Sequence, residues 1–350
     1  MLQPVLKKQV ENVSRSFSFV IAQLPEPLQT EVSLGYLLFR LGDNIEDTSS
    51  LTADTKHELL LALLQSFRTE KPLSKDLQDA DVEHWRDLTD GELELMRHVD
   101  EIIAAFSAMD AQAKADLLEQ ANIMFAGMAD FQKAERHDGY VVLSTTKDLD
   151  RYCYYVAGTV GDFLTNRFLD YMSGIGEQRK AQLLGSARSL ALVLQVTNIL
   201  RDITDDHQHG HIFYPMSLFD SFDAPHLLDR ENHDQVLQAG CKMVRWLWPA
   251  IRLAGAYILA IPKRYHRLRI FCAIPYFMAL KTLSVTLGNP AIFSHEPVRI
   301  SRGETKRTVL EAQIAVHSDQ LLTLVTRHLQ SRVLVALDEK SRSGHKSTRA

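Results

Sequence analysis

Two short acidic segments carry carboxylates at a spacing that suits cation binding. The first, residues 40–47 (RLGDNIED), has Asp43 and Asp47 four positions apart and Glu46 between them. In a helix these side chains share one face, with Cβ atoms about 5–6 Å apart. Like charges at this spacing repel each other and destabilise an isolated helix. A bound cation would remove that cost, so the segment predicts a metal site.

The second segment, residues 198–206 (NILRDITDD), repeats the pattern with Asp202 and Asp206, and Arg201 precedes the first aspartate. Carboxylate oxygens suit Mg²⁺, which binds a few carboxylates and leaves positions for water and substrate phosphate. Two such faces opposed across a cavity would hold several ions and a diphosphate, with the metals acting as Lewis acids on a leaving group. Aspartates at this spacing also occur on solvated helix surfaces, and the pattern alone leaves both interpretations open.

Helices must position these residues, since helical periodicity covers most of the chain and alternating strand patterns are nearly absent. The scarcity of glycine and proline, 16 and 11 of 350 residues, also favours long helices. Thr145 and Asp148 have the spacing of a capping box that begins a helix. We expect an all-α protein with one domain over residues 1–336 and a polar, frayed C-terminal tail over 337–350. The expected helices span residues 4–22, 27–48, 52–67, 92–108, 111–134, 147–173, 177–206, 233–261, 266–287 and 303–336.

The composition excludes several classes of protein. A formal net charge of −5 argues against a nucleic-acid partner. Three widely separated cysteines without metal-ligand spacing indicate a reduced, intracellular protein. No signal peptide is evident, and Arg252 and Lys281 interrupt the two most apolar windows, so neither supplies the roughly 20 apolar residues of a spanning helix. We therefore expect a cytoplasmic protein without a transmembrane anchor.

Four segments in a fixed order resemble the squalene/phytoene synthase family: the two acidic segments, residues 14–17 (SRSF) and residues 151–161 (RYCYYVAGTVG). The similarity runs from about residue 6 to residue 329. Residues 271–275 (FCAIP) resemble squalene synthases more than phytoene synthases. The resemblance implies an isoprenoid-synthase-type helical fold around a central hydrophobic cavity.

The resemblance also implies an activity, namely Mg²⁺-dependent head-to-head condensation of two farnesyl diphosphates to presqualene diphosphate. An NADPH-dependent reductive rearrangement to squalene would follow. By this similarity, Mg²⁺ would be coordinated by Asp43, Glu46, Asp47, Asp202 and Asp206. The substrate would be held by Ser14, Arg15, Arg40, Gln195, Asn198, Arg201 and Phe271. The phosphates of NADPH would meet Arg15, Arg40, Arg201, Arg299 and Arg302.

The chemistry of such a coupling needs a proton acceptor and a dry chamber. Ionisation of an allylic diphosphate gives a carbocation that water would capture, and aromatic walls stabilise it. Formation of a cyclopropane also removes a proton, and the resemblance points to Tyr152 as the base, with Tyr36 as the other candidate. A tyrosine with a pKa near ~10 is a weak base, so the released diphosphate would be its partner.

Three positions depart from the family pattern. His211 stands where the family usually has arginine or lysine, which weakens one expected diphosphate contact or makes it pH-dependent. Ser301 replaces a cation between Arg299 and Arg302, which puts the reductive half-reaction in more doubt than the coupling. Arg269 stands where squalene synthases tend to have an aromatic residue, so cation–π shielding at that wall could be thinner.

Several alternatives stay open. The enzyme could stop at presqualene diphosphate, give another C30 product such as dehydrosqualene or hydroxysqualene, or act on C20 substrates as a phytoene synthase. Two further hypotheses lie outside the enzyme class, namely a non-catalytic assembly relative and a prenyl-lipid binding protein. The run His207, His209 and His211 could hold zinc, although no fourth ligand is suggested. Gly158 and Gly161 indicate close helix packing or room for a prenyl chain. We expect a monomer that contacts a membrane surface transiently to release its water-insoluble product.

Overall fold

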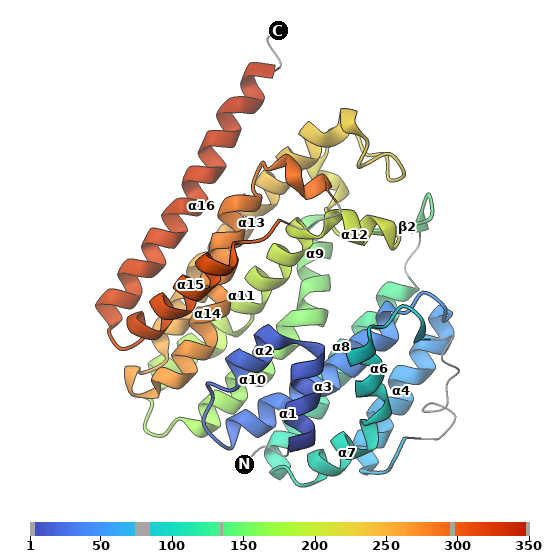
Figure 1. Ribbon diagram of the computed structural model, residues 1–350, viewed down its shortest axis with the longest axis vertical. Coiled ribbons are helices and arrows are strands. Elements are labelled where there is room, and N and C mark those ends of the chain that lie inside the picture. Colours follow the sequence, from blue (N-terminus) through green and yellow to red (C-terminus); the bar gives the residue numbers. More distant parts are fainter. Residues whose placement is uncertain (1–3, 74–84, 134–135, 295–297, 348–350) are drawn as a thin grey trace. The chain divides into compact units, whose positions relative to one another are not determined.

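The computed structural model describes residues 4–73, 85–133, 136–294 and 298–347, with the side chains of residues 15, 16 and 339–347 outside the description. The chain forms two compact units. Unit 1 comprises residues 1–133 and 162–174, and unit 2 comprises residues 134–161 and 175–350. The described residues are overwhelmingly helical, which confirms the all-α prediction (Figure 1).

Unit 1 is built on the long helix α3, whose side chains Leu34, Leu37, Leu38 and Leu41 are fully buried. A Cβ atom on Gly42 would lie 2.2 Å from the ring of Phe125, so α8 packs directly against the α3 backbone. Its helices are α1 (Pro4–Val13), α2 (Arg15–Ile21), α3 (Leu28–Asp47), α4 (Ala53–Thr69), α6 (Asp90–Arg97), α7 (Val99–Ser107) and α8 (Ala111–Gln132).

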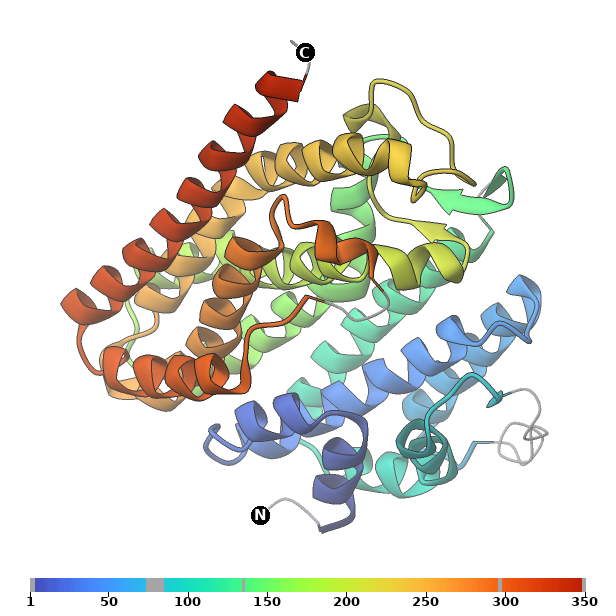
Figure 2. The same cartoon turned by 45° about the horizontal axis from the view of Figure 1, so that its top comes forward.

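Unit 2 contains the longest helices of the described chain. Helix α16 runs along its outside and extends past α13 and α15 (Figures 1 and 2). The helices are α9 (Thr146–Cys153), a π-helical turn (Tyr154–Gly158), α10 (Thr159–Tyr171, which crosses into unit 1), α11 (Glu177–Arg201), α12 (Ile203–Gln208), α13 (His233–Ala260), α14 (His266–Thr286), α15 (Arg302–Ala315) and α16 (Asp319–Ser347). Short 3₁₀ turns cover Met216–Leu218, Arg230–Asn232, Lys263–Tyr265 and Pro290–Phe293.

A small sheet in unit 2 was not expected from the sequence. Its strands are β1 (Arg136–His137), β2 (Tyr140–Val142) and β3 (His211–Ile212). β1 pairs antiparallel with β2, and β2 pairs parallel with β3. Strands of two or three residues are too short to show an alternating pattern, so apolar periodicity could not predict them.

Five of the expected helices are interrupted. Helix 4–22 divides because Ser14 caps α2 by accepting a hydrogen bond from the Phe17 amide (3.2 Å). Helix 92–108 divides at His98, and helix 177–206 divides at Asp202, both in non-helical conformations. Helix 147–173 contains the π turn, and helix 303–336 is two helices, the second of which continues to Ser347 past the boundary expected at 336.

The capping-box prediction for α9 is confirmed. The Asp148 amide donates to Thr145 Oγ1 (3.3 Å), and the Thr145 amide donates to Asp148 Oδ2 (2.9 Å). Two reciprocal bonds satisfy amides that the first helical turn leaves without partners. The start of this helix matters because Tyr152 lies on its last turn.

Two buried cations on α14 hold the neighbouring helices of unit 2. Arg269, 1% exposed, donates to the carbonyls of Leu259, Ile261 and Val316 and pairs with Asp319 (2.7 Å). The Arg269 guanidinium thus binds the carbonyls at the ends of α13 and α15, and the thinner cation–π shielding expected at this position stays a prediction.

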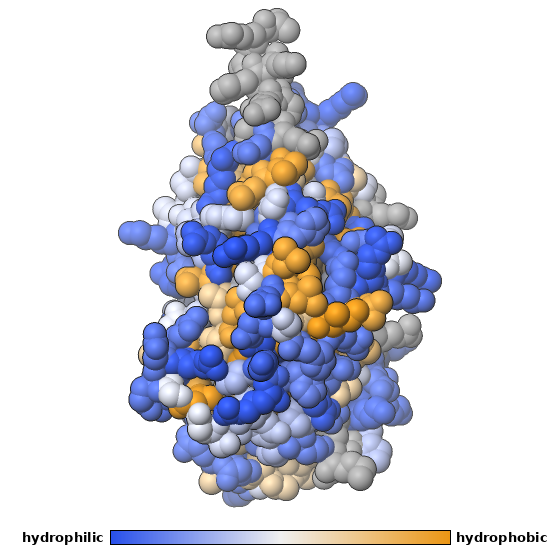
Figure 3. All heavy atoms as spheres, turned by 90° about the vertical axis from the view of Figure 1, so that its left-hand side faces the viewer, coloured by the Kyte–Doolittle hydropathy of each residue, from blue (hydrophilic) through white to orange (hydrophobic). Residues whose placement is uncertain are grey.

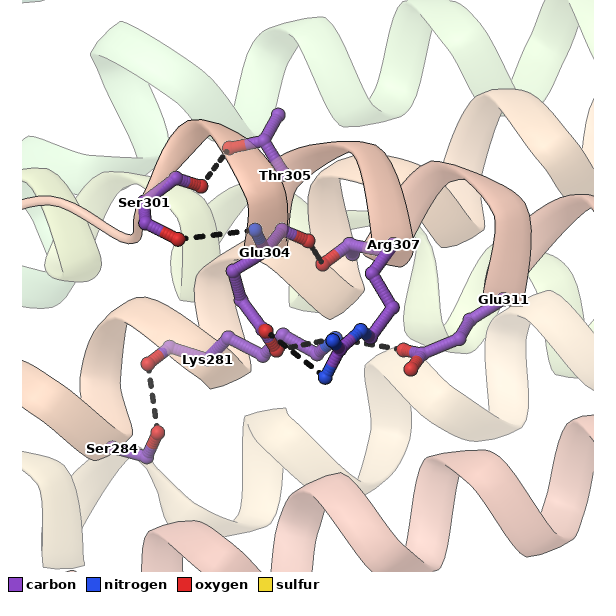
Figure 4. Close-up of polar contacts among 8 residues, drawn as sticks. Lys281, Ser284, Ser301, Glu304, Thr305, Arg307 and Glu311 are labelled. Carbon is purple, nitrogen blue, oxygen red and sulfur yellow. Dashed lines mark hydrogen bonds and ion pairs between the residues drawn. The ribbon is translucent and has the colours of Figure 1, made fainter.

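The second buried cation, Lys281, is 3% exposed and pairs with Glu304 (2.9 Å) and Glu311 (2.7 Å) of α15 (Figure 4). Buried charges of this kind need partners, and here both carboxylates come from one helix. The pairing fixes α15 against α14 close to the beginning of α15.

Two helical stretches are long and apolar enough, by length and composition alone, to cross a membrane: Glu177–Arg201 and Lys263–Thr286. Half of the apolar window of the first and 72% of that of the second are buried within the protein. Core helices of this length pass the same compositional test.

Candidate active site

The first acidic site is the group Asp43, Glu46 and Asp47 on the last two turns of α3. The guanidinium of Arg40, one turn earlier, lies 3.7 Å from Asp43 Oδ2 and also pairs with Glu92 of α6. Unit 1 thus brings together four predicted site residues and one further acid, Glu92. We name this group site A.

Burial and the repulsion between neighbouring carboxylates raise the pKa values of two site A residues. Burial raises the pKa of Asp43 to about 7, Arg40 opposes this, and Asp47 adds to it. Burial also raises the pKa of Glu46 to about 8, with Asp47 and Asp43 adding to it and Lys56 opposing it. The Asp43 side chain keeps 34% of its surface exposed, so solvent still reaches it. A bound cation would favour the ionised forms of these carboxyls.

Glu92 is a site A residue that the sequence analysis did not identify. Both the amide and the hydroxyl of Thr89 donate to Glu92 Oε2 (2.8 Å each), which leaves Oε1 for Arg40. Thr89 and Glu92 have the threonine-x-x-glutamate spacing of a capping box, so a local signal existed. That signal predicts a helix start, whereas the pairing with Arg40 is a long-range contact that sequence spacing does not reveal.

Tyr36 and Ser14 lie together in unit 1. The Ser14 side chain hydrogen bonds to Tyr36, whose ring stacks on Phe17 with centroids 5.3 Å apart. Burial raises the pKa of Tyr36, and the Ser14 bond and Arg40 oppose this less strongly. Tyr36 therefore keeps its proton and serves as a hydrogen-bond donor more readily than as a base. The side chain of Arg15, also predicted to bind substrate, lies outside the described residues.

The second acidic site, site B, lies where α11 ends. Asp202 caps α11 and receives both Nε (2.7 Å) and Nη2 of Arg201, a bidentate pair. The Asp206 amide still bonds to the Asp202 carbonyl (3.0 Å), so one helical turn links the two aspartates across the break. Gln195 and Asn198 precede them at positions of α11 that share this helical side. Unit 2 thus gathers the predicted residues of the second motif.

Tyr152 is 9% exposed and stacks on Phe213, with centroids 4.5 Å apart and ring planes 17° apart. Phe213 in turn stacks on His211, at 5.6 Å and 7°. The π-helical turn that begins two residues after Tyr152 is a feature often found at functional sites. His211 therefore faces an aromatic ring where the family usually carries a longer cation.

The two glycines near Tyr152 favour close packing. A Cβ atom on Gly161 would lie 2.6 Å from the carbonyl oxygen of Ala187 on α11. A Cβ atom on Gly158 would lie 2.8 Å from the ring of Tyr154, which itself lies beneath the guanidinium of Arg188 at 4.0 Å. Glycine is required at position 161 because the backbone of Ala187 lies too close to leave room for a Cβ atom, whereas Gly158 leaves room for the ring of Tyr154 in its own helical turn.

The remaining predicted residues lie elsewhere in unit 2. Phe271 is buried on α14, whereas Arg299 and Arg302 are exposed before and at the start of α15. Ser301 Oγ accepts a hydrogen bond from the Glu304 amide (3.1 Å) and so caps α15 (Figure 4). The residue that replaces a cation of the family pattern thus has a structural role as a helix cap.

The three histidines of the H-x-H-x-H run have different surroundings. His207 Nε2 donates to the Ala224 carbonyl (2.9 Å), and His209 Nδ1 donates to the Asp205 carbonyl (2.8 Å). Within the described ranges, no three His, Cys, Asp or Glu side chains form a group that could hold a metal alone. The zinc interpretation therefore has no support in this part of the chain.

Site A and site B fit Mg²⁺ in one specific sense. Each offers aspartate oxygens, the ligands that Mg²⁺ prefers, with too few of them to enclose an ion. The other coordination positions would fall to water and to phosphate oxygens, for which Arg40 and Arg201 are the adjacent cations. A separate cavity of about 1070 Å³ lies among α1, α2, α3 and α6, and none of the predicted site residues lines it.

Comparisons with known proteins agree with the sequence motifs. The sequence pattern of the squalene/phytoene synthase family matches residues 10–304. The squalene synthase of Saccharomyces cerevisiae is 30% identical over 331 residues, which cover 92% of this chain and 70% of the yeast protein. A probable squalene synthase of Neurospora crassa is 28% identical over 313 residues, 87% of this chain and 61% of the fungal protein.

Solved structures share the fold. A ligand complex of TcSQS has a TM-score of 0.77 at 24% identity, over 96% of this chain and 98% of that one. A dehydrosqualene synthase complex has a TM-score of 0.59 at 19% identity, over 89% and 94%. These likenesses confirm the isoprenoid-synthase-type helical fold. Since the family pattern covers most of the sequence, the chain belongs to the squalene/phytoene synthase family.

Proposed function

We propose that the protein is a prenyltransferase of the squalene synthase type. It condenses two farnesyl diphosphates to presqualene diphosphate and rearranges and reduces this intermediate to squalene with NADPH. The observation that carries the proposal is the pair of sites A and B, each an arginine beside aspartates at the end of a long helix. Relatives named squalene synthases, at about 30% identity over most of the chain, support the same conclusion.

The chain's own residues account for diphosphate binding. In the proposed complex Asp43, Glu46 and Asp47 hold Mg²⁺ at site A, and Asp202 and Asp206 hold it at site B. Bound Mg²⁺ supplies positive charge that stabilises the departing diphosphate. Fixed arginine forks bind phosphate oxygens without reorganising during the reaction. Arg40 is held by Glu92, and Arg201 by Asp202, before any substrate arrives.

The remaining substrate contacts follow the family motifs. Ser14, Arg15, Gln195 and Asn198 complete the proposed diphosphate-binding set, and Phe271 belongs to the proposed prenyl-binding wall. Ser14 is already engaged by Tyr36 and by its own helix, so its hydroxyl is fixed in place. Fixed donors lose little entropy on binding.

Tyr152 is the proposed proton-transfer residue. As the cyclopropane closes, a C–H bond breaks, and the proton passes through the tyrosine hydroxyl to an oxygen of the released diphosphate. Electrons of that C–H bond form the new C–C bond. Burial of the ring beside Phe213 keeps water from competing with this transfer. Tyr36 is the other candidate, but its raised pKa favours a donor role.

The cofactor assignment rests on exposed arginines. Arg299 and Arg302 lie near the beginning of α15, where Lys281 fixes the helix. They are the proposed contacts for the 2′-phosphate of NADPH. Arg15, Arg40 and Arg201 are proposed contacts for the phosphates of the cofactor. Because Ser301 is a helix cap and not a cation, a coupling enzyme that stops at presqualene diphosphate or releases another C30 product is the second candidate function.

The deciding experiment is product analysis with C15 and C20 diphosphates, each with and without NADPH and Mg²⁺. The proposal expects presqualene diphosphate from the C15 substrate with Mg²⁺ alone, and squalene once NADPH is added. Presqualene diphosphate, dehydrosqualene or hydroxysqualene in the presence of NADPH would favour the second candidate. Phytoene from the C20 substrate, or no product at all, would reject the proposal in favour of a phytoene synthase or a non-catalytic relative.

A membrane surface is the proposed partner for product release, since squalene is insoluble in water. Figure 3 shows apolar groups among charged ones on the face that carries α16. Exposed apolar side chains of the last two helices are Leu310 and Ile314 of α15 and Leu324, Leu334 and Val335 of α16. Exposed apolar side chains bordered by arginines suit the interface of an anionic bilayer. We place the protein in the cytoplasm, as a monomer that binds this surface peripherally.

Flotation with anionic vesicles tests the membrane proposal. We expect the protein to float with vesicles, and Leu324→Glu combined with Leu334→Glu to leave it at the bottom of the gradient. Leu61→Glu changes a leucine on α4 that is 52% exposed, between Leu324 at 65% and Leu334 at 42%. It is the matched control and should still float. Equal behaviour of both variants, or no flotation of the native protein, would reject this surface.

A further inference from the structure

Three rings form a continuous stack in unit 2: Tyr152, Phe213 and His211. Their centroids are 4.5 and 5.6 Å apart and their planes 17° and 7° apart. Tyr152 is buried, whereas Phe213 and His211 are half-buried. Flat aromatic pairs at these distances attract each other beyond the burial of their area. The stack therefore restrains the plane of the Tyr152 ring.

Backbone bonds hold the outer two rings in place. The segment that carries them begins in β3, which pairs with β2 through Val141 and Val142, and the Val141 amide donates to the Gly210 carbonyl (2.9 Å). On the other side of Phe213, the Met216 amide donates to the Leu143 carbonyl (2.8 Å). The rings are thus mounted on a segment fixed at both ends, which is what a support for another side chain requires.

Tyr214 adds a third attachment to the same segment. Its side chain is buried, and its hydroxyl donates to the Leu200 carbonyl (3.4 Å), two residues before Asp202. The support of the Tyr152 ring is thereby linked to the last turn of α11, on which Arg201 lies. The small sheet and the residues after it join two parts of the proposed site within unit 2.

We infer that Phe213, supported by His211, is a positioning residue for Tyr152. This inference rests on the proposed role of Tyr152 in proton transfer. The O–H bond of a tyrosine prefers to lie in the plane of its ring, so the plane of the ring sets the direction of that bond. A flat partner on one face restrains this plane. Proton transfer requires the donor and the acceptor at hydrogen-bond distance with the O–H bond directed at the acceptor. A rotated ring turns the O–H bond away from the acceptor. The histidine that replaces the family's longer cation here lies flat against Phe213.

The test is a double-mutant cycle on formation of presqualene diphosphate without NADPH. Phe213→Leu should lower kcat about 3- to 10-fold with the KM for farnesyl diphosphate unchanged. Phe213→Tyr, which keeps a flat ring, should restore kcat. In a Tyr152→Phe background, Phe213→Leu should have no further effect on kcat, because both substitutions remove the same function, proton transfer through the Tyr152 hydroxyl. Phe222→Leu, a half-buried ring of the same loop whose ring contacts are Phe219 and His137, is the matched control and should leave kcat unchanged.

A measurement independent of turnover tests the geometry. In protein labelled with 3-fluorotyrosine, the ¹⁹F resonance of Tyr152 is the one that disappears in Tyr152→Phe. Phe213→Leu should move this resonance, since the ring current of Phe213 is lost, and Phe222→Leu should not. Additive effects in the cycle, a change confined to KM, or an unmoved resonance would overturn the inference. Absence of any C30 product from the native protein would instead overturn the proposed function. The ¹⁹F resonance of Tyr152 would still test whether Phe213 stacks on Tyr152.

Discussion

Sites A and B share one sequence pattern and differ in their electrostatics. In site A, Arg40 is divided between Asp43 and Glu92, and the carboxyl pKa values are raised to about 7 and about 8. In site B, Arg201 makes a bidentate pair with Asp202. Two aspartates four residues apart therefore determine a shared helix face, whereas burial and the contacts of the neighbouring arginine differ between the two sites. Site A groups several carboxyl groups around one arginine, and site B pairs its first aspartate with an arginine of its own.

The largest effects are expected from removing one aspartate from each site. Asp43→Asn and Asp202→Asn should each lower turnover at least about 100-fold, because each removes a proposed Mg²⁺ ligand and charge stabilisation of the leaving group. The fold should survive in both, as judged by circular dichroism. Turnover close to that of the native protein in either variant would contradict the proposed mechanism.

The same two variants should change stability in opposite directions when no metal is present. Asp43→Asn relieves like-charge crowding and should raise the melting temperature, whereas Asp202→Asn leaves Arg201 without its bidentate partner and should lower it. The expected shifts are about 2–4 °C, corresponding to about 1 kcal/mol. Thermal unfolding in EDTA measures both, and shifts of the same sign would remove the distinction between the sites.

Replacement of Glu92 tests how Arg40 is held. Glu92→Gln keeps a side chain of similar shape but removes the charge that pairs with Arg40 and weakens the cap on α6. We expect turnover to fall about 10-fold, since a loosened arginine stabilises the leaving group less well. Steady-state kinetics with farnesyl diphosphate measure this. Glu94→Gln, on the same helix, is the control and should have no effect.

The pH dependence of stability should originate in site A. For Asp43 and Glu46 the pKa is higher in the folded protein than in the unfolded chain, so the folded state binds more protons between about pH 4 and pH 8. The stability of the metal-free protein should therefore fall as pH rises through this window. Added Mg²⁺ should restore more stability at pH 8 than at pH 6. Asp43→Asn combined with Glu46→Gln should flatten the profile, whereas Asp202→Asn should keep it.

The smallest effect is expected from replacing Asp47 or Asp206, the second aspartate of each site. Asp47 is exposed and acts on its neighbours mainly by raising their pKa values. Asp47→Asn should move the same stability profile to lower pH by less than one unit, and Asp206→Asn should leave it in place. Urea unfolding of the metal-free variants at several pH values resolves the shift. A profile that moves with Asp206→Asn would mean that the two sites titrate together.

Much of the molecule followed from the sequence. Apolar periodicity identified the all-α class, and the motifs around Asp43, Tyr152 and Asp202 identified the family, because their residue types and spacing are local properties of the chain. The capping box at Thr145 was also local and was correct. The interruptions at Ser14, His98 and Asp202 were missed, since apolar periodicity continues across a single residue that leaves the helical conformation.

The tertiary structure alone decided how the charged and aromatic residues are used. Glu92 reaches Arg40 across 52 residues, and Phe213 reaches Tyr152 across 61. Arg269 binds the carbonyls at the ends of α13 and α15, at a position where the family pattern has an aromatic residue. Ser301 caps α15, at a position where the family pattern has a cation. The sequence determined which groups are available because spacing along a helix fixes a face. Only packing brought distant groups within hydrogen-bond or ring-contact distance, and those contacts set their charge and orientation.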